Sequence, residues 1–253
     1  MTAAFGTHLK DWRGRRRLSQ LDLALSANVS ARHIAFLETG RSKPSREMVI
    51  QLSDALSVPR SDRNAMLHAA GFAQSYQRRD LDHEQMVHVR DAVTWTLQRH
   101  DPYPALAVDR HWTLVMANKS ATMLLASANI HVGDSMLDAA INSDDLRDSI
   151  VNWPDVARHI HTRLRTESAY LGGDPILDAA ADKLANELQP LRETELLPAI
   201  VPTTYRAGEI ELSLFSTIAQ FGTAEDIALA DLKIELMFPA DDTTRDMLLA
   251  QAT

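Results

Sequence analysis

A short stretch near the start of the sequence carries side chains whose types and spacing suit contacts with nucleic-acid bases. In S-A-R-H-I-A-F-L-E, a helical period of about 3.6 residues turns Ile34 and Leu37 to one side. The same period turns Arg32 and Phe36 to the opposite side, with Ala31 next to them. Arginine pairs with guanine O6 and N7, and phenylalanine or alanine contacts the thymine methyl group. We therefore predict that Ala31, Arg32 and Phe36 face bases, the alternative being an ordinary amphipathic helix with an exposed phenylalanine.

Polar side chains on both sides of this helix suit contacts with phosphate groups. Gln20 begins the preceding helix, where backbone N–H groups and the positive end of the helix dipole favour an anion. Thr39, Arg41 and Lys43 follow the base-facing helix in a loop that can run along a nucleic-acid backbone. We predict that these four residues face phosphate.

A helix, a tight turn and a second helix must position these residues. Ser19 and Asp22 have the spacing of an N-terminal capping box for the first helix. Leu21, Ala24 and Leu25 are predicted to form its inward apolar stripe.

The turn and the second helix have their own signals. Asn28 tolerates the left-handed conformation that a tight turn needs. Ser30 can cap the second helix, and Gly40 can end it in the left-handed conformation. These signals predict a helix-turn-helix.

The pattern L-S-Q-x-x-L-A, then V-S, then L-E-x-G-R-x-x-P-S, resembles the lambda-repressor-like, XRE-type DNA-binding domain over about residues 5–72. The resemblance implies the same base-facing and phosphate-facing positions. It also implies a partly buried ion pair, Arg13 with Glu38, that ties the first helix to the recognition helix. The sequence departs from the family at Ala31 and Phe36, where relatives often have glutamine or another polar residue. Hydrogen-bond readout would then rest chiefly on Arg32.

The rest of the N-terminal part completes a five-helix, all-α bundle. We expect a first helix over 5–17, a fourth after Ser45 and a fifth over 61–70. The inward residues of the first are Phe5, Leu9 and Trp12, and those of the fourth are Met48, Val49, Leu52 and Leu56. We assign residues 1–72 to the DNA-binding domain.

Charge divides the chain in the same way. Residues 1–79 hold 13 Lys and Arg against 6 Asp and Glu, a net +7, whereas residues 80–253 hold 13 against 28, a net −15. Such asymmetry indicates a nucleic-acid-binding end. The chain has no Cys, which excludes disulfides and thiolate chemistry. The first ten residues lack an apolar signal core and no run approaches 18 apolar residues, so we expect a cytoplasmic protein with no membrane partner.

Residues 73–100 are predicted to be a polar linker followed by a connecting helix. Met86, Val89, Val93 and Leu97 give the helix over 84–99 one apolar face. Another face carries Glu84, His88 and Asp91, which could hold a metal ion, although a solvated face is the simpler interpretation. We therefore expect no metal site.

The remaining residues, 101–253, change to an α+β pattern. Short strands are expected over 105–108 and 113–117, and later strands over 198–206, 208–221 and 227–238. Helices are expected over 118–126 and near 136–141, 144–151, 154–168 and 174–188. Strands with helices inserted after the first two predict an α+β domain.

This order resembles the MmyB-like ligand-binding domain, a PAS-like sensor fold, over about residues 101–240. The motifs are P-Y-P-A-L-A-V-D-R-H-W-T-L-V-M-A-N, then V-N-W followed by L-R-x-E, and the final strand pair. The resemblance implies a cavity for a fatty acid or similar apolar molecule. Candidate cavity residues are Trp112, Asn118, Trp153, Phe215, Phe221 and Phe238.

No nucleophile elbow, phosphate-binding loop, dinucleotide fingerprint or zinc-protease motif occurs, so we predict a regulator without a catalytic site or required cofactor. It would bind an inverted-repeat operator in double-stranded DNA as a homodimer and respond to a small-molecule effector. An antitoxin-like DNA-binding protein and an enzyme tethered to DNA are the alternatives.

Overall fold

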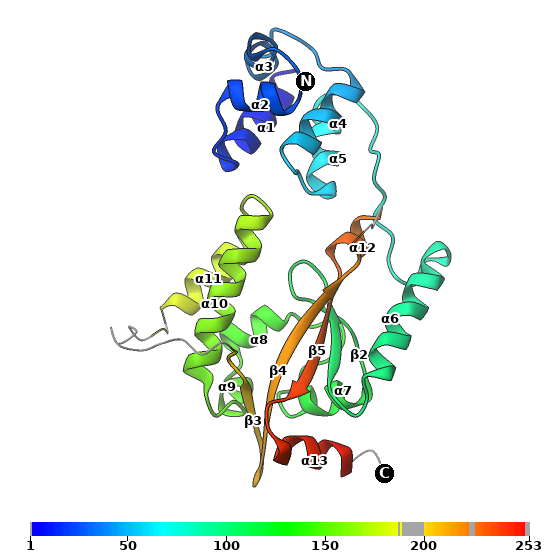
Figure 1. Ribbon diagram of the computed structural model, residues 1–253, viewed down its shortest axis with the longest axis vertical. Helices are drawn as coiled ribbons and strands as arrows, with labels where there is room; N and C mark the ends of the chain where they lie inside the picture. Colours follow the sequence, from blue (N-terminus) through cyan, green and yellow to red (C-terminus); the bar gives the residue numbers. More distant parts are fainter. Residues whose placement is uncertain (1, 187, 189–199, 223–225, 251–253) are drawn as a thin grey trace. The chain divides into compact units, whose positions relative to one another are not determined.

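The structure, a computed structural model, describes the following residues: 2–186, 188, 200–222 and 226–250. Contacts within the chain divide it into two compact units, coloured along the sequence in Figure 1. The first unit comprises residues 1–78 with two short later segments, 168–174 and 225–227, and the second comprises the rest. Separate clusters of buried apolar side chains occupy residues 5–67 and residues 93–248.

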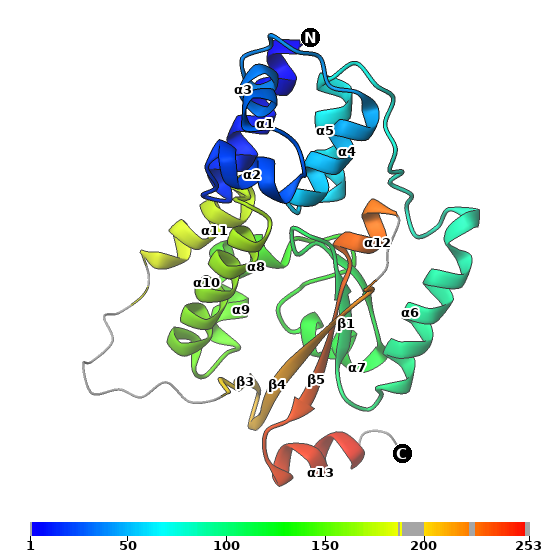
Figure 2. The same ribbon diagram turned by 45° about the horizontal axis from the view of Figure 1, so that its top comes forward.

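Five α-helices lie within residues 2–78 of the described chain (Figure 2). They are α1 Thr2–Arg15, α2 Gln20–Ser26, α3 Ala31–Glu38, α4 Arg46–Ala55 and α5 Arg60–Ala69. Helix α3 packs against both α1 and α2, and α4 packs against α5. The predicted all-α bundle is confirmed.

The predicted helix caps of this bundle are present. The Ser19 hydroxyl accepts from the Asp22 N–H at 3.1 Å, and the Asp22 carboxylate accepts from the Ser19 N–H at 2.8 Å. Ser30 and Ser45 each accept from the backbone N–H three residues later, at 3.1 Å. These bonds satisfy backbone donors that no helical carbonyl can reach.

The turn between α2 and α3 and the end of α3 also follow the prediction. Asn28 has φ 48° and Gly40 has φ 71°, both in the left-handed region. Backbone bonds from Val29 to the Ala24 carbonyl and from Gly40 to the Leu37 carbonyl close these turns at 2.9 and 3.2 Å. Local sequence therefore fixes the angle at which α3 leaves α2.

The predicted inward stripe of α2 is partly wrong. Leu21 and Leu25 are 59% and 73% exposed, whereas Leu23 and Ala24 are buried. A seven-residue helix has room for two apolar stripes, and contact with α3 and α4 selects the one through Leu23. Ala24 alone of the three predicted residues faces the core.

The second unit is built on a curled antiparallel sheet, and its five strands among the described residues have the order β2-β1-β5-β4-β3 (Figure 1). The strands are β1 Ala105–Val108, β2 Leu114–Ala117, β3 Thr203–Ala207, β4 Ile210–Gln220 and β5 Lys233–Pro239. Strands β4 and β5 pair from Leu214 with Pro239 to Gln220 with Lys233. The predicted α+β class is confirmed.

Helices occupy the connections between these strands and both ends of the unit. They are α6 Val87–Arg99 after the short 3-10 helix η1 Glu84–Met86, α7 Lys119–Ala126, α8 Met136–Asn142, α9 Asp144–Asp148, α10 Trp153–Tyr170, α11 Pro175–Ala185, α12 Ile227–Asp231 and α13 Asp242–Ala250. The predicted helices near 118–126, 136–141, 144–151, 154–168 and 174–188 are confirmed, although residue 187 lies outside the described residues.

The two faces of the sheet belong to different apolar clusters because neighbouring side chains of a strand point to opposite faces. Leu106 and Val108 of β1 join a cluster with residues of α7 to α10. Ala105 and Ala107 join a second cluster with Val93 and Leu97 of α6. Helix α6 is therefore part of the sheet domain and not a separate connecting helix, which moves the expected boundary at residue 101 toward the N-terminus.

Two segments near the C-terminus differ from the prediction. The strand predicted over 227–238 is a short helix, α12, followed by β5, because the alanine-rich run I-A-L-A-D has helix-forming residues that periodicity alone cannot assign. Helix α13, which was not predicted, begins where the Asp241 carboxylate accepts from the Thr244 N–H at 2.7 Å.

The strand predicted over 198–206 begins at Thr203 in the structure, and residues 198 and 199 lie outside the described residues. The turn predicted after β4 includes residues 223–225, which also lie outside them.

None of the described helices is long and apolar enough to cross a lipid bilayer. Across the described chain, no three His, Asp or Glu side chains gather closely enough to hold a metal ion. Glu84, His88 and Asp91 are exposed on η1 and α6.

Candidate DNA interface and ligand cavity

Helix α3 presents one apolar face to the core and one mixed face to solvent. Ile34 and Leu37 are fully buried, Arg32 is exposed, and Ala31 and Phe36 are half-buried. The Arg32 guanidinium lies 5.1 Å from the centre of the Phe36 ring, one helical turn away. This stacking restricts the arginine while leaving its N–H groups free to meet a base edge.

A network around Glu38 joins the first three helices. The Arg13 Nε and Nη2 atoms donate to the two Glu38 oxygens at 2.6 and 3.0 Å, and Arg13 Nη1 donates to the Leu18 carbonyl at 2.8 Å. Gln20 Nε2 donates to the same carboxylate at 2.8 Å. The Arg13 and Glu38 side chains are only 16% and 4% exposed. The structure thus contains the ion pair that the family resemblance implied, and it includes Gln20 as a third member.

The network keeps Glu38 ionised. Burial alone would raise the pKa of this carboxyl, but the hydrogen bonds from Arg13 and Gln20 and the nearby positive charges outweigh burial, so the pKa is lowered. A carboxylate held in this way fixes α3 against α1 and α2.

The four residues expected to face phosphate have different surroundings. Arg41 and Lys43 are exposed after α3. Thr39 donates its hydroxyl hydrogen to the Ala35 carbonyl at 2.7 Å, and the Gln20 amide nitrogen is engaged by Glu38. Arg41 and Lys43 are therefore the side chains with donors directed to solvent, whereas Gln20 and Thr39 use theirs within the domain.

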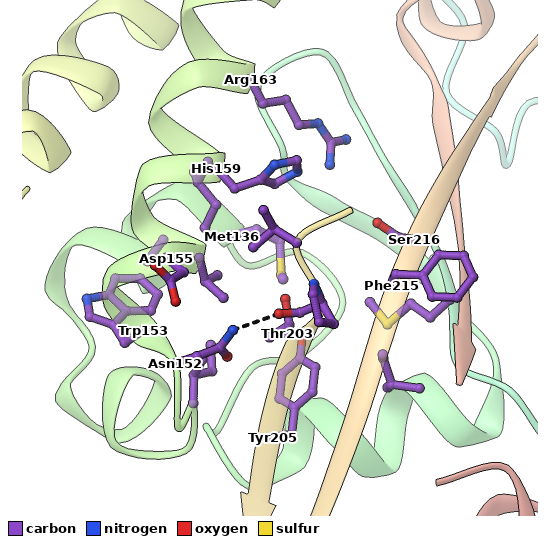
Figure 3. A pocket seen from close by; sticks show the side chains of 18 of the residues that line it. Met136, Asn152, Trp153, Asp155, His159, Arg163, Thr203, Tyr205, Phe215 and Ser216 are labelled. Carbon is purple, nitrogen blue, oxygen red and sulfur yellow. Dashed lines mark hydrogen bonds between the residues drawn. The ribbon is translucent and has the colours of Figure 1, made fainter. Parts of the chain in front are cut away.

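The second unit contains a partly open cavity of about 1140 Å³, lined by α8, α10 and strands of the sheet (Figure 3). Its volume is slightly above the usual range for small-molecule sites, roughly 300–1,000 Å³. Most of the lining is apolar, including Leu106, Leu137, Ala140, Ile150, Val156, Ile160, Leu214 and Met237.

Three of the six predicted cavity residues line it and three do not. Trp112, Trp153 and Phe215 belong to the lining. Phe221 packs in the cluster with α6, and Phe238 stacks on Phe215 at 5.7 Å. Aromatic content alone could not tell which of these rings would line the cavity.

Asn118, the remaining candidate, is a buried structural residue outside the cavity lining. Its side-chain oxygen accepts from the N–H groups of Ala105 and Ala121 at 3.0 and 2.9 Å. Its nitrogen donates to the carbonyls of Leu97 and Tyr103 at 3.1 and 2.8 Å. These four bonds use the full capacity of the amide.

Charged residues that sequence reasoning missed form a network with Arg163 and Glu235, which line the cavity. Arg163 donates to Glu167 at 3.0 Å and to Glu235 at 3.1 Å, and Lys233 donates to Glu167 at 2.8 Å. Arg163 and Lys233 lie 4.0 and 4.8 Å from the Trp112 ring centre. A signal was present, because two charges at alternate positions in a buried strand, K-I-E, require partners.

The pKa values of these groups differ in whether burial or the neighbouring charges determine the direction of the shift. Burial raises the pKa of Glu167, but the charge and hydrogen bond of Lys233 and the bond from Trp112 outweigh it, so the pKa is lowered. Burial dominates for Lys233 and lowers its pKa. Burial and the charge of Arg163 together lower the pKa of His159, which leaves this imidazole neutral at neutral pH.

Two family models match the chain. A helix-turn-helix domain matches residues 4–66, and the MmyB-like transcription regulator ligand binding domain matches residues 89–250. No curated protein matches the sequence. The first match covers the bundle that carries Arg32, and the second covers the sheet domain with its cavity and begins inside α6. Because the second model spans well over half of the 253 residues, the chain is a DNA-binding transcriptional regulator that belongs to the MmyB-like ligand-binding family.

Proposed function

We propose that this regulator changes its affinity for DNA when an apolar small molecule, such as a fatty acid or a related acyl compound, occupies the cavity of the second unit. The observation that supports the proposal is the cavity itself, about 1140 Å³ with a largely apolar lining. A concave site of this size with many apolar side chains suits a small molecule that has an apolar part. A hydrocarbon chain is the simplest occupant.

We further propose that the protein acts as a two-fold homodimer on an inverted-repeat operator. One recognition helix reads only a few base pairs, too few to identify a single genomic site. The half-site centres would then lie about 10 bp apart, or a multiple of that distance. The second unit would supply the dimer contact, because the apolar side chains of the first unit serve mainly its own core.

Denaturing mass spectrometry of organic extracts from the purified protein tests the ligand. We expect a co-purifying acyl compound, and we expect that removing and restoring it shifts the affinity for operator DNA in gel-shift titrations. An empty extract, together with DNA affinity that does not respond to added fatty acids or esters, would contradict the proposal.

Light scattering and footprinting test the assembly. Residues 80–253 should dimerise without DNA, residues 1–78 should be largely monomeric, and the footprint of the full chain should have dyad symmetry. A monomeric 80–253 fragment or an asymmetric footprint would contradict the homodimer.

A further inference from the structure

Arg163 holds a buried donor without an acceptor beside the cavity. Its Nε and Nη1 atoms donate to Glu167 and Glu235. Its Nη2 atom is buried and has no hydrogen-bond partner among the described residues. The guanidinium lies 4.0 Å from the Trp112 ring centre and its side chain is 13% exposed, so it cannot turn freely to find water. A buried N–H of this kind is unfavourable until an acceptor reaches it.

A molecule in the cavity is one source of such an acceptor. Arg163 and Glu235 both line the cavity, and Figure 3 shows Arg163 and His159 extending from helix α10 toward the strand that carries Ser216. Ser216 donates to Glu235 at 2.6 Å and thus offers no free hydrogen. Arg163 Nη2 is therefore a buried donor at this end that a ligand could satisfy.

The fixed charges at this end of the cavity cancel. Arg163 and Glu235, which both line the cavity, pair at 3.1 Å, and Glu167, outside the lining, pairs with Arg163 at 3.0 Å and with Lys233 at 2.8 Å, so two positive charges meet two negative charges. His159 is neutral at neutral pH, because burial and the neighbouring Arg163 lower its pKa. The other two charged lining residues, Asp155 and Arg158, are again one of each sign. A ligand carboxylate would add a negative charge with no cation left to balance it, which is costly away from water.

We propose that the ligand is an uncharged acyl compound, an ester, lactone or amide with a hydrocarbon chain, whose carbonyl oxygen accepts from Arg163 Nη2, and that the cavity disfavours the free carboxylic acid. The hydrocarbon chain would lie along the apolar lining of α8 and β4. This inference rests on the proposed function, because it names the head group of the molecule that the cavity is proposed to bind.

Calorimetric titration of the full-length protein at pH 8 with dodecanoic acid and methyl dodecanoate, both below their aggregation concentrations, tests it. We expect the ester to bind about ten-fold or more tightly than the acid. An acid that binds as tightly as the ester would overturn the head-group assignment and leave the proposed function standing. If neither compound binds and no acyl compound co-purifies, the proposed function fails and this inference fails with it.

Two variants distinguish specific recognition of the head group by Arg163 from a general preference of an apolar cavity for neutral molecules. Arg163→Lys keeps the charge but removes the forked donor. It should lower the affinity for the ester about ten-fold and leave the affinity for the acid unchanged. Arg165→Lys, two residues along α10 at an exposed pair with Asp178 and Asp182, is the matched control and should change neither affinity. Ester binding that is equal in wild type and Arg163→Lys would overturn the proposal.

A third variant tests the charge balance at this end of the cavity. Glu235→Gln removes one negative charge without changing shape, so the acid should gain about ten-fold in affinity while the ester changes little. An unchanged acid affinity would overturn the role of charge balance. If this variant does not fold, the comparison of acid and ester in the wild type and in Arg163→Lys still decides the matter.

Discussion

The two units each contain an arginine that joins separate elements through partly buried carboxylates, but only Arg13 of the two has a hydrogen bond from every side-chain nitrogen among the described residues. In the first unit, all three nitrogens of Arg13 donate, two of them to Glu38 and one to a backbone carbonyl. In the second unit, Arg163 uses two nitrogens and leaves the third buried without an acceptor among the described residues. A complete network holds helices together, and an incomplete one beside a cavity indicates a binding site.

The largest effect is expected from breaking the complete network. Glu38→Ala leaves the Arg13 charge in a largely buried position and should lower the free energy of unfolding of the first unit by about 2–3 kcal/mol. Thermal unfolding of the full-length protein, followed by circular dichroism, measures the loss. Glu47→Ala is the control, because Glu47 is exposed at the start of α4. Equal melting temperatures for the two variants would mean that Glu38 is only a solvated charge.

The next variant tests whether the network depends on close contact between the backbones of α1 and α3. A Cβ atom on Gly6 would lie 2.6 Å from the Leu37 carbonyl oxygen and no farther from that of Glu38. Gly6→Ala should therefore force α1 away from α3 and cost about 1–3 kcal/mol.

Gly14→Ala is the matched control in the same helix, since nothing lies within 4 Å of the added atom. It should be neutral or stabilise α1 by up to about 1 kcal/mol, because alanine is the better helix former. Equal melting temperatures for the two glycine variants would refute the close approach.

A third test compares the basic side chains on and after α3 that face outward. Arg32→Ala should lose about 1–3 kcal/mol of discrimination between operator and random DNA, because the base contact disappears. Arg41→Ala or Lys43→Ala should weaken binding to all sequences alike and reduce its salt dependence. Competition gel shifts with specific and random duplexes distinguish the two outcomes. If Arg32→Ala keeps the specificity ratio, Arg32 does not read bases.

The smallest expected effect is a loss of stability at acidic pH. His159 has a lowered pKa in the folded second unit, so the unfolded chain binds its proton first, and stability should begin to fall as the pH drops below the usual histidine value of about 6.5. The contribution of Glu38, whose pKa is also lowered, should be lost only below the usual glutamate value of about 4.3.

Scanning calorimetry of the full-length protein between pH 8 and 5 measures this difference. His159→Gln should remove the decline that begins near the histidine value. A decline of the same size in the variant would show that other groups cause it.

Sequence reasoning succeeded where the signals are local. Ser19, Ser30, Asn28 and Gly40 act on backbone within three or four residues, and each has the predicted conformation or hydrogen bond. It failed for Leu21 and Leu25 because the inward face of a short helix is chosen by its neighbours. Local chemistry therefore predicts where a helix begins and ends better than which way it faces.

The cavity was predictable only as an expectation from family resemblance. Its charged end brings together Trp112, Arg163 and Lys233 from three distant parts of the chain, and no short motif contains them. The three candidates that do not line the cavity have different surroundings: Asn118 caps α7, Phe221 follows β4, and Phe238 pairs with Phe215 across β4 and β5. Register became known only with the paired strands.

The hydrogen bonds of the Asn118 amide also predict which residues open to solvent together. Its four partners, on Leu97, Tyr103, Ala105 and Ala121, all lie within one stretch of chain that includes the end of α6, β1 and the start of α7. Withdrawing the side chain removes the Asn118 partner of four backbone groups at once. The amide hydrogens of Ala105 and Ala121 should therefore exchange with solvent at matched rates, in a single cooperative opening of residues 97–121.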